Sequence, residues 1–116
     1  MSDANDSVMD KYNELLKGFA SKLKDRIIDI ENAANDLFDN GYTPEKMELL
    51  HRLVHSLTGT SAMFGLAKVS EASFNAEIYL KPFAKENKTF DNTVDSSEIK
   101  NRLINLKETI SEQIAE

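Results

Sequence analysis

The 116-residue sequence contains no cysteine, only two prolines and only four glycines. Without cysteine the chain has no disulfides, no zinc–thiolate sites and no thiol chemistry. No apolar run approaches the roughly 20 residues of a membrane-spanning helix, and no signal-peptide pattern opens the chain. Basic residues number 14 against 20 acidic ones, for a formal net charge of −6. Because nucleic-acid binding needs clustered cations, this balance argues against a nucleic-acid partner.

The composition is that of an ordinary globular protein, with 41% apolar and 29% charged residues. A chain of this length fits one domain with a single core. We therefore expect one helical domain over residues 1–116, with residues 1–7 flexible, in a cytoplasmic protein.

Apolar residues at steps of three and four predict a first helix from about Val8 to Phe38. Gly18 is a point at which a short N-terminal lead-in helix could separate from a longer one, and Asn40-Gly41 is a stop signal. The apolar stripe of this first helix consists of Tyr12, Leu15, Leu16, Phe19, Leu23, Ile27, Ile30, Ala34 and Leu37.

A second helix is predicted from Thr43, as N-cap, and Pro44, in the first turn, to about Met63, with a stop near Gly65. A third begins around Ala67, and Pro82 should kink or end it because proline removes a backbone donor. The apolar side of the third helix carries Val69, Ala72, Ala76, Leu80 and Phe83.

Residues 85–93 are polar and predict a loop. The sequence Asp95-Ser-Ser-Glu98 resembles a capping box that opens a last helix. The apolar stripe of the last helix consists of Ile99, Leu103, Leu106, Ile110 and Ile114. Four amphipathic helices with short links predict an all-α fold, an antiparallel up-down-up-down four-helix bundle.

The second helix separates into two halves when its residues are placed at about 100° intervals. The apolar half contains Met47, Leu49, Leu50, Leu53, Val54, Leu57 and Phe64. Ser61 falls within that half and needs a hydrogen bond if it is buried. The polar half contains Glu48, His51, Arg52, His55, Ser56, Thr58, Gly59 and Ala62.

His55 lies near the middle of the polar half, with Gly59 and Ala62 one and two turns further along. A glycine inside a helix costs about 1 kcal/mol relative to alanine, so Gly59 needs a reason. Removal of its side chain would clear the approach to His55 for a bulky partner. The alternative is that His55 is an ordinary polar surface residue.

His51 and His55 are four residues apart and could face one metal ion. Metalloprotease helices with this spacing carry a glutamate after the first histidine, where this chain has Arg52. No third ligand with suitable spacing is evident, so we expect no native metal site. His51 would then either tune the local charge or serve only as a surface residue.

The spacing His55, Gly59, Gly65, flanked by Leu57 and Leu66, resembles the signature of the histidine-containing phosphotransfer (HPt) family. The resemblance implies that His55 carries a phosphoryl group on Nε2, exchanged with aspartates of response-regulator receiver domains in two-component signalling. It also implies that Glu77, 22 residues later, accepts a hydrogen bond from Nδ1 and orients the ring. The HPt domain itself would hold no cofactor, and the receiver would supply Mg²⁺.

The chain departs from the family at Thr58, where a lysine is common. Thr58 offers only a hydroxyl, so Arg52 or Lys81 would have to compensate for the missing charge. The resemblance further implies a monomeric phosphohistidine carrier rather than an enzyme, whose partners are a receiver domain, a hybrid histidine kinase or both.

Docking should use the apolar residues near the histidine, which are Ala62, Met63, Phe74 and Ile78. Phe74 and Ile78 could alternatively pack against the N-terminal residues. The competing hypothesis for the whole chain is a degenerate HPt-like module that docks on a receiver or kinase without phosphate chemistry. The absent lysine favours that module, whereas His55 and both glycines count against it.

Overall fold

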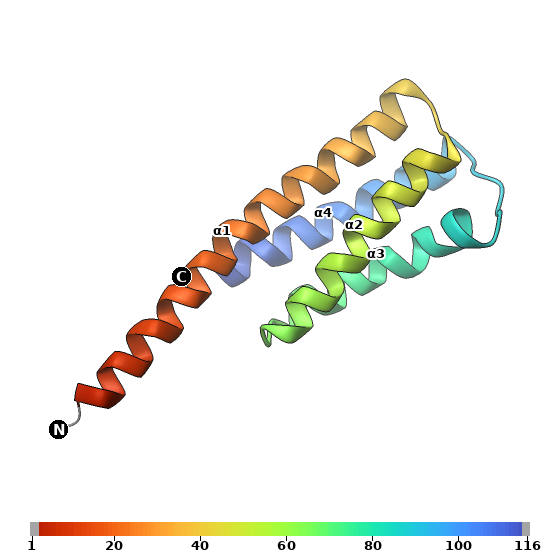
Figure 1. The fold of residues 1–116 in the computed structure, drawn as a ribbon. Helices are drawn as coiled ribbons and strands as arrows, with labels where there is room; N and C mark the ends of the chain where they lie inside the picture. Colours follow the sequence, from red (N-terminus) through yellow and green to blue (C-terminus); the bar gives the residue numbers. More distant parts are fainter. Residues whose placement is uncertain (1–2, 115–116) are drawn as a thin grey trace.

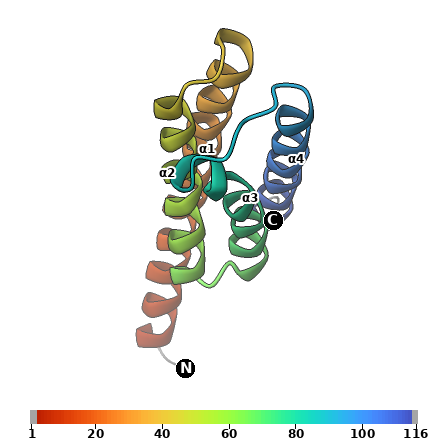
Figure 2. The same cartoon turned by 90° about the vertical axis from the view of Figure 1, so that its right-hand side faces the viewer.

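The computed structural model describes the backbone of residues 3–114 and the side chains from Val8 to Ile114, apart from Leu16. The chain forms four helices: α1 (Asp3–Asn40), α2 (Pro44–Met63), α3 (Ala67–Lys85) and α4 (Val94–Ile114). Successive helices run antiparallel, and each packs against the next, with α4 closing the ring against α1 (Figures 1 and 2). This arrangement confirms the predicted up-down-up-down bundle. Within the described residues, no helix combines the length and apolarity required to cross a membrane.

The core is formed by the apolar stripes of all four helices. Its buried members are Phe19, Leu23, Ile27, Ile30, Ala34, Leu37, Met47, Leu50, Val54, Leu57, Val69, Ala72, Ala76, Leu80, Phe83, Ile99, Leu103, Leu106 and Ile110. The three-and-four spacing places these residues on one face of each helix, and their burial is the main stabilising contribution to the bundle.

Helix α1 is continuous through Gly18, so the expectation of a separate lead-in helix is wrong. One glycine costs only about 1 kcal/mol in a helix, too little to break it when its neighbours keep their hydrogen bonds. The N-terminal part of α1 projects beyond the bundle (Figure 1), and Tyr12 and Leu15 of the apolar stripe are exposed there. Of the segment expected to be flexible, residues 3–7 belong to α1 and residues 1–2 lie outside the described range.

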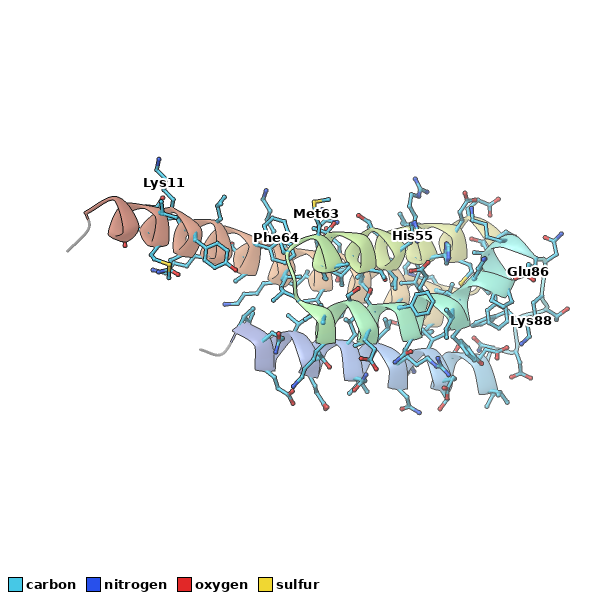
Figure 3. The ribbon with its side chains drawn as sticks, turned by 90° about the horizontal axis from the view of Figure 1, so that it is seen from below. Lys11, His55, Met63, Phe64, Glu86 and Lys88 are labelled. Atoms are coloured by element: carbon cyan, nitrogen blue, oxygen red, sulfur yellow. The ribbon has the colours of Figure 1, made fainter. Side chains whose placement is uncertain are left out.

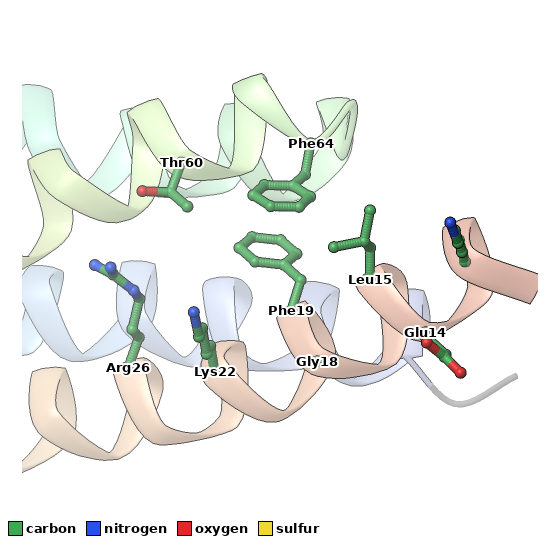
Figure 4. Close-up of a pocket in the computed structure, with 9 residues that line it drawn as sticks. Glu14, Leu15, Gly18, Phe19, Lys22, Arg26, Thr60 and Phe64 are labelled. Carbon is green, nitrogen blue, oxygen red and sulfur yellow. The ribbon is translucent and has the colours of Figure 1, made fainter.

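An aromatic pair joins α1 to the C-terminal end of α2. The rings of Phe19 and Phe64 stack with their centroids 4.1 Å apart and their planes 6° from parallel. Figure 4 shows the two rings face to face, one from each helix. Phe19 is therefore the first buried residue of the described part of α1, and the bundle proper begins there.

Helix α2 begins and ends as its sequence predicts. Thr43 is the N-cap, and its hydroxyl oxygen accepts a hydrogen bond from the Lys46 N–H at 3.1 Å. At the other end Gly65 has a positive φ of 76°, which favours glycine. The Gly65 N–H donates to the Ala62 carbonyl and the Leu66 N–H to the Ser61 carbonyl, a Schellman motif. Both ends of the histidine helix are thus fixed.

The junction of α3 and α4 differs from the prediction at one point. Pro82 lies in the last turn of α3, which continues to Lys85. Asp91 caps α4, because its Oδ1 accepts hydrogen bonds from the N–H groups of Thr93 and Val94 at 2.9 and 2.8 Å. The predicted capping box is wrong: Asp95 is buried and accepts a hydrogen bond from the Tyr79 hydroxyl at 2.5 Å. Its predicted partner Glu98 pairs with Arg102 instead.

Candidate functional site

Two serines of α3 fix that helix against α2 on either side of His55. The Ser73 hydroxyl donates to the Val54 carbonyl at 3.0 Å, and the Ser70 hydroxyl donates to the Thr58 carbonyl at 3.0 Å. Both accepting carbonyls lie within one turn of His55. The two bonds therefore set the register of α3 against α2 at the level of the histidine.

The register places a carboxylate beside the histidine. His55 lies near the middle of α2 (Figure 3), and its Nδ1 is 2.7 Å from Oε2 of Glu77 on α3. The two side chains differ greatly in exposure, at 69% for His55 and 11% for Glu77. The ring therefore protrudes into solvent while the carboxylate that contacts it is held in the wall of the bundle.

This contact determines which ring nitrogen is free to react. A carboxylate oxygen can only accept a hydrogen bond, so Nδ1 of His55 carries the hydrogen. In the neutral ring Nε2 then keeps its lone pair. The arrangement suits a nucleophile whose second nitrogen is held by a neighbouring group.

An open groove between α2 and α3 surrounds this pair. It is lined by Glu48, His51, Arg52, His55, Glu77, Lys81 and Lys85. The structure thus brings together His55, Glu77, Arg52 and Lys81, all of which the sequence predicts for the site. Lys85 is a third cation in the groove that the sequence reasoning missed, although it lies four residues after Lys81 and thus on the same side of α3.

Thr58 is half-buried and its hydroxyl faces α3, whereas helical phase places it in the polar half of α2. Its Oγ1 is 3.1 Å from the Val54 carbonyl oxygen and 2.9 Å from Oγ of Ser73. Because α3 covers this flank of α2, the hydroxyl is engaged within the bundle. Any compensation for the missing lysine must therefore come from the cations of the groove rather than from Thr58.

His51 is also placed differently from the prediction, since it is buried with only 7% of its surface exposed. Burial lowers the pKa of His51 below its usual value, nearby Glu77 opposes this effect, and the charges of Lys85, His55 and Lys81 add to it. The ring lies roughly parallel to that of His55, with the centroids 6.1 Å apart. The surface-residue reading of His51 is therefore wrong.

Three buried polar atoms among the described side chains have no hydrogen-bond partner. They are Nε2 of His51, Oε1 of Glu77 and Oγ of Ser61. Ser61 thus lacks the hydrogen bond that its buried position calls for, and nothing in the structure explains this. The other two atoms both belong to the histidine groove.

Gly59 lies on the exposed side of α2, one turn after His55. A Cβ atom built on Gly59 would meet nothing within 4 Å, so packing inside this chain does not require a glycine here. The glycine instead leaves open space beside His55 that a partner molecule can occupy.

The four predicted docking residues are all exposed. Met63, labelled in Figure 3 toward the end of α2, is 82% exposed, and Phe74 and Ile78 are about half exposed. Ala62 and Phe74 line a second shallow groove between α2 and α3. Phe74 and Ile78 are not covered by the described part of the N-terminal segment, which projects away from α3 along the axis of α1 (Figure 1).

A metal site is not evident in this region. Among the side chains that the structure describes, no three histidine or acidic side chains are placed to hold a metal ion together. His51 and His55 share one side of α2, but Nδ1 of His55 is occupied by Glu77. The groove instead combines two imidazoles, of which only that of His55 is exposed, with two carboxylates and three cations.

Comparison with known protein families agrees with this geometry. The Hpt domain model matches residues 14–111, which include all of α2 and α3 and most of α1 and α4. Neither the search of curated proteins nor the search of solved structures returned a match. Because the family match covers most of the 116 residues, the chain belongs to the Hpt domain family, whose members carry out histidine phosphotransfer in phosphorelays.

Proposed function

We propose that the protein is a phosphorelay intermediate that accepts and donates a phosphoryl group on Nε2 of His55. The partners would be aspartates of response-regulator receiver domains, free or within a hybrid histidine kinase. The single observation that carries this proposal is the 2.7 Å contact of Nδ1 with Glu77, which leaves Nε2 of an exposed ring free.

In the forward step, the Nε2 lone pair of His55 attacks the phosphorus of an aspartyl phosphate on the receiver. The N–P bond forms as the P–O bond breaks, and the aspartate leaves as a carboxylate with the electron pair. The proton on Nδ1 stays, so the phosphorylated ring gains positive charge that the Glu77 carboxylate balances. Donation is the reverse of the same step. Mg²⁺ for charge neutralisation would belong to the receiver.

The cations of the groove supply the positive charge that a lysine at position 58 would otherwise provide. Arg52 on α2 and Lys81 on α3 both line the groove that contains His55. The phosphoryl oxygens need donors or positive charge near the reacting nitrogen. The Thr58 hydroxyl is held by Val54 and Ser73 and does not serve this purpose.

The same side of the bundle offers a docking surface for a receiver, made of Ala62, Met63, Phe74 and Ile78. An exposed apolar patch of this kind is typical of a protein–protein contact site. Gly59 lies between His55 and this patch along α2, and its missing side chain leaves room for a receiver to approach. We therefore propose that the protein acts as a carrier and leaves the charge stabilisation of transfer to its partner.

The test is phosphoryl transfer from a phosphorylated receiver of the same organism, measured as acid-labile label on the protein. Wild type should be labelled and His55→Gln should not, while His51→Gln serves as the matched control and keeps the label. Label on His55→Gln would refute the assignment of the site. Absence of label on wild type, with receivers that bind it, would instead support a docking module without phosphate chemistry.

A further inference from the structure

The histidine groove contains one unpartnered nitrogen and one unpartnered carboxylate oxygen. Glu77 uses Oε2 for His55, but its Oε1 is buried with no partner. His51 is nine-tenths buried in the same groove, and its Nε2 has no partner either. Buried polar groups are nearly always hydrogen-bonded, because a buried donor or acceptor without a partner destabilises the folded state. Two unmet atoms in one groove therefore call for a common explanation.

The register of the two helices places these groups at the same level. The Ser70–Thr58 hydrogen bond fixes one pair of opposed positions on α3 and α2. Seven residues forward along α3 from Ser70 is Glu77, and seven residues back along α2 from Thr58 is His51. Because the helices are antiparallel, Glu77 lies opposite His51 and reaches one turn along α2 to contact His55.

We propose that His51 is a positioning residue for the phosphoacceptor, which holds the Glu77 carboxylate from the side opposite His55. The two unpartnered atoms are not bonded to each other in the structure. A small rotation of either side chain lets the Nε2–H of His51 donate to Oε1 of Glu77, while Nδ1–H of His55 donates to Oε2. The carboxylate is thus fixed by two histidines one helical turn apart. This inference rests on the proposed function of His55 and adds a second histidine to its site.

The charge state of His51 fits this role. Burial lowers its pKa, and Lys85, His55 and Lys81 lower it further against the opposing effect of Glu77, so the ring is neutral at pH 7. The other charged groups of the groove are Arg52 and Glu48 on α2. A neutral donor can orient the carboxylate without cancelling its negative charge. That charge stays available for the ring of His55.

The first test uses the wild-type protein and needs no phosphate. Long-range ¹H–¹⁵N NMR spectra of the histidine rings identify which nitrogen carries the hydrogen. We expect Nε2–H on His51 and Nδ1–H on His55 at pH 7. Nδ1–H on His51 would overturn the inference and leave the proposed function of His55 intact.

The second test compares His51→Phe, which fills the volume without a donor, with His51→Gln, which keeps an N–H donor. His51→Phe should lower the Nδ1–H population of His55 and slow phosphorylation about fivefold, the effect of one ordinary hydrogen bond. His51→Gln should keep both within about twofold of wild type. An unchanged His55 tautomer in His51→Phe, or equal slowing in both variants, would contradict the proposal. If His51→Phe does not fold, the ring tautomer of His51 in the wild-type protein tests the proposal on its own.

Discussion

At the residue scale, the site depends on a contrast between an exposed ring and the buried groups that hold it. His55 protrudes from α2, while Glu77 lies in the wall between α2 and α3. Two serine hydroxyls bonded to carbonyls on α2 keep that wall in register. The reactive nitrogen can therefore meet a partner without any rearrangement of the bundle.

At Gly59, substitution should preserve or raise the stability of the protein while a large side chain slows phosphoryl transfer. Because a Cβ there meets nothing within 4 Å, Gly59→Ala should stabilise the protein by up to about 1 kcal/mol in chemical denaturation. Gly59→Leu should fold equally well but slow transfer from a receiver by about tenfold or more, which corresponds to 1.4 kcal/mol of lost docking.

The matched control is Gly18→Leu. Gly18 is also helical and a Cβ atom there would meet nothing within 4 Å, but it lies on α1, away from His55. The control should transfer phosphate at the wild-type rate. Equal rates for Gly59→Leu and wild type would show that the partner does not approach over Gly59.

Sequence reasoning places His55 correctly on the exposed side of α2 and misplaces His51 and, in part, Thr58, for one physical reason. Helical phase divides α2 into two halves, but α2 packs against both α1 and α3, so its buried arc is wider than a half. His51 and Thr58 lie at the edge of that arc, and α3 covers them. Which edge of α2 an adjacent helix covers depends on how the four helices pack. The residue pattern of a single helix carries no information on that packing.

At the element scale, the helices follow from periodicity and end signals that are local in sequence. Thr43, Pro44 and Gly65 predict the bounds of α2. Thr43 and Gly65 act through hydrogen bonds within a few residues, and Pro44 acts because the first turn needs no N–H from it. The cap of α4 differs from the prediction because Asp91 and Asp95 are both acceptable caps by sequence. Asp95 is instead drawn into the bundle by a hydrogen bond from Tyr79, a contact between different helices.

The link between Tyr79 and Asp95 predicts a loss of stability at high pH. Burial, helped by the hydrogen bond to Asp95, raises the pKa of Tyr79 from 10.0 to about 12. Between these values the unfolded chain loses the phenolic proton while the folded chain keeps it, so stability falls as pH rises above 10. Denaturation of wild type and Tyr79→Phe across this pH range should show a smaller decline in the free energy of unfolding for the variant. Equal declines in the two proteins would contradict the raised pKa of Tyr79.

At the scale of the whole molecule, one part of α1 contributes to the core of the bundle and the other part projects beyond it. Among the described side chains, the buried core begins at Phe19, whereas Val8, Met9, Tyr12 and Leu15 are exposed. The family match begins at residue 14. The sequence predicts the bundle because the apolar stripes of the four helices need each other for burial. It does not predict where α1 leaves the bundle, since the apolar stripe of α1 continues unchanged past the ends of α2 and α4.

Deletion of residues 1–13 should therefore leave the bundle intact. We expect the free energy of unfolding to change by less than about 0.5 kcal/mol, as for other changes away from the core. Phosphoryl transfer to His55 should proceed at the wild-type rate. A large loss of stability would mean that the N-terminal turns of α1 pack on the bundle, and slower transfer by a stable truncated protein would assign those turns to partner binding.

The central claim is that the phosphoryl group resides on Nε2 of His55 while Nδ1 keeps its hydrogen bond to Glu77. The most direct measurement is NMR of the ¹⁵N-labelled protein after phosphorylation by a small-molecule donor such as phosphoramidate. We predict phosphorus coupling to Nε2 of His55, with a proton retained on Nδ1. Phosphorus on Nδ1 of His55, on His51 or on neither histidine would contradict the account.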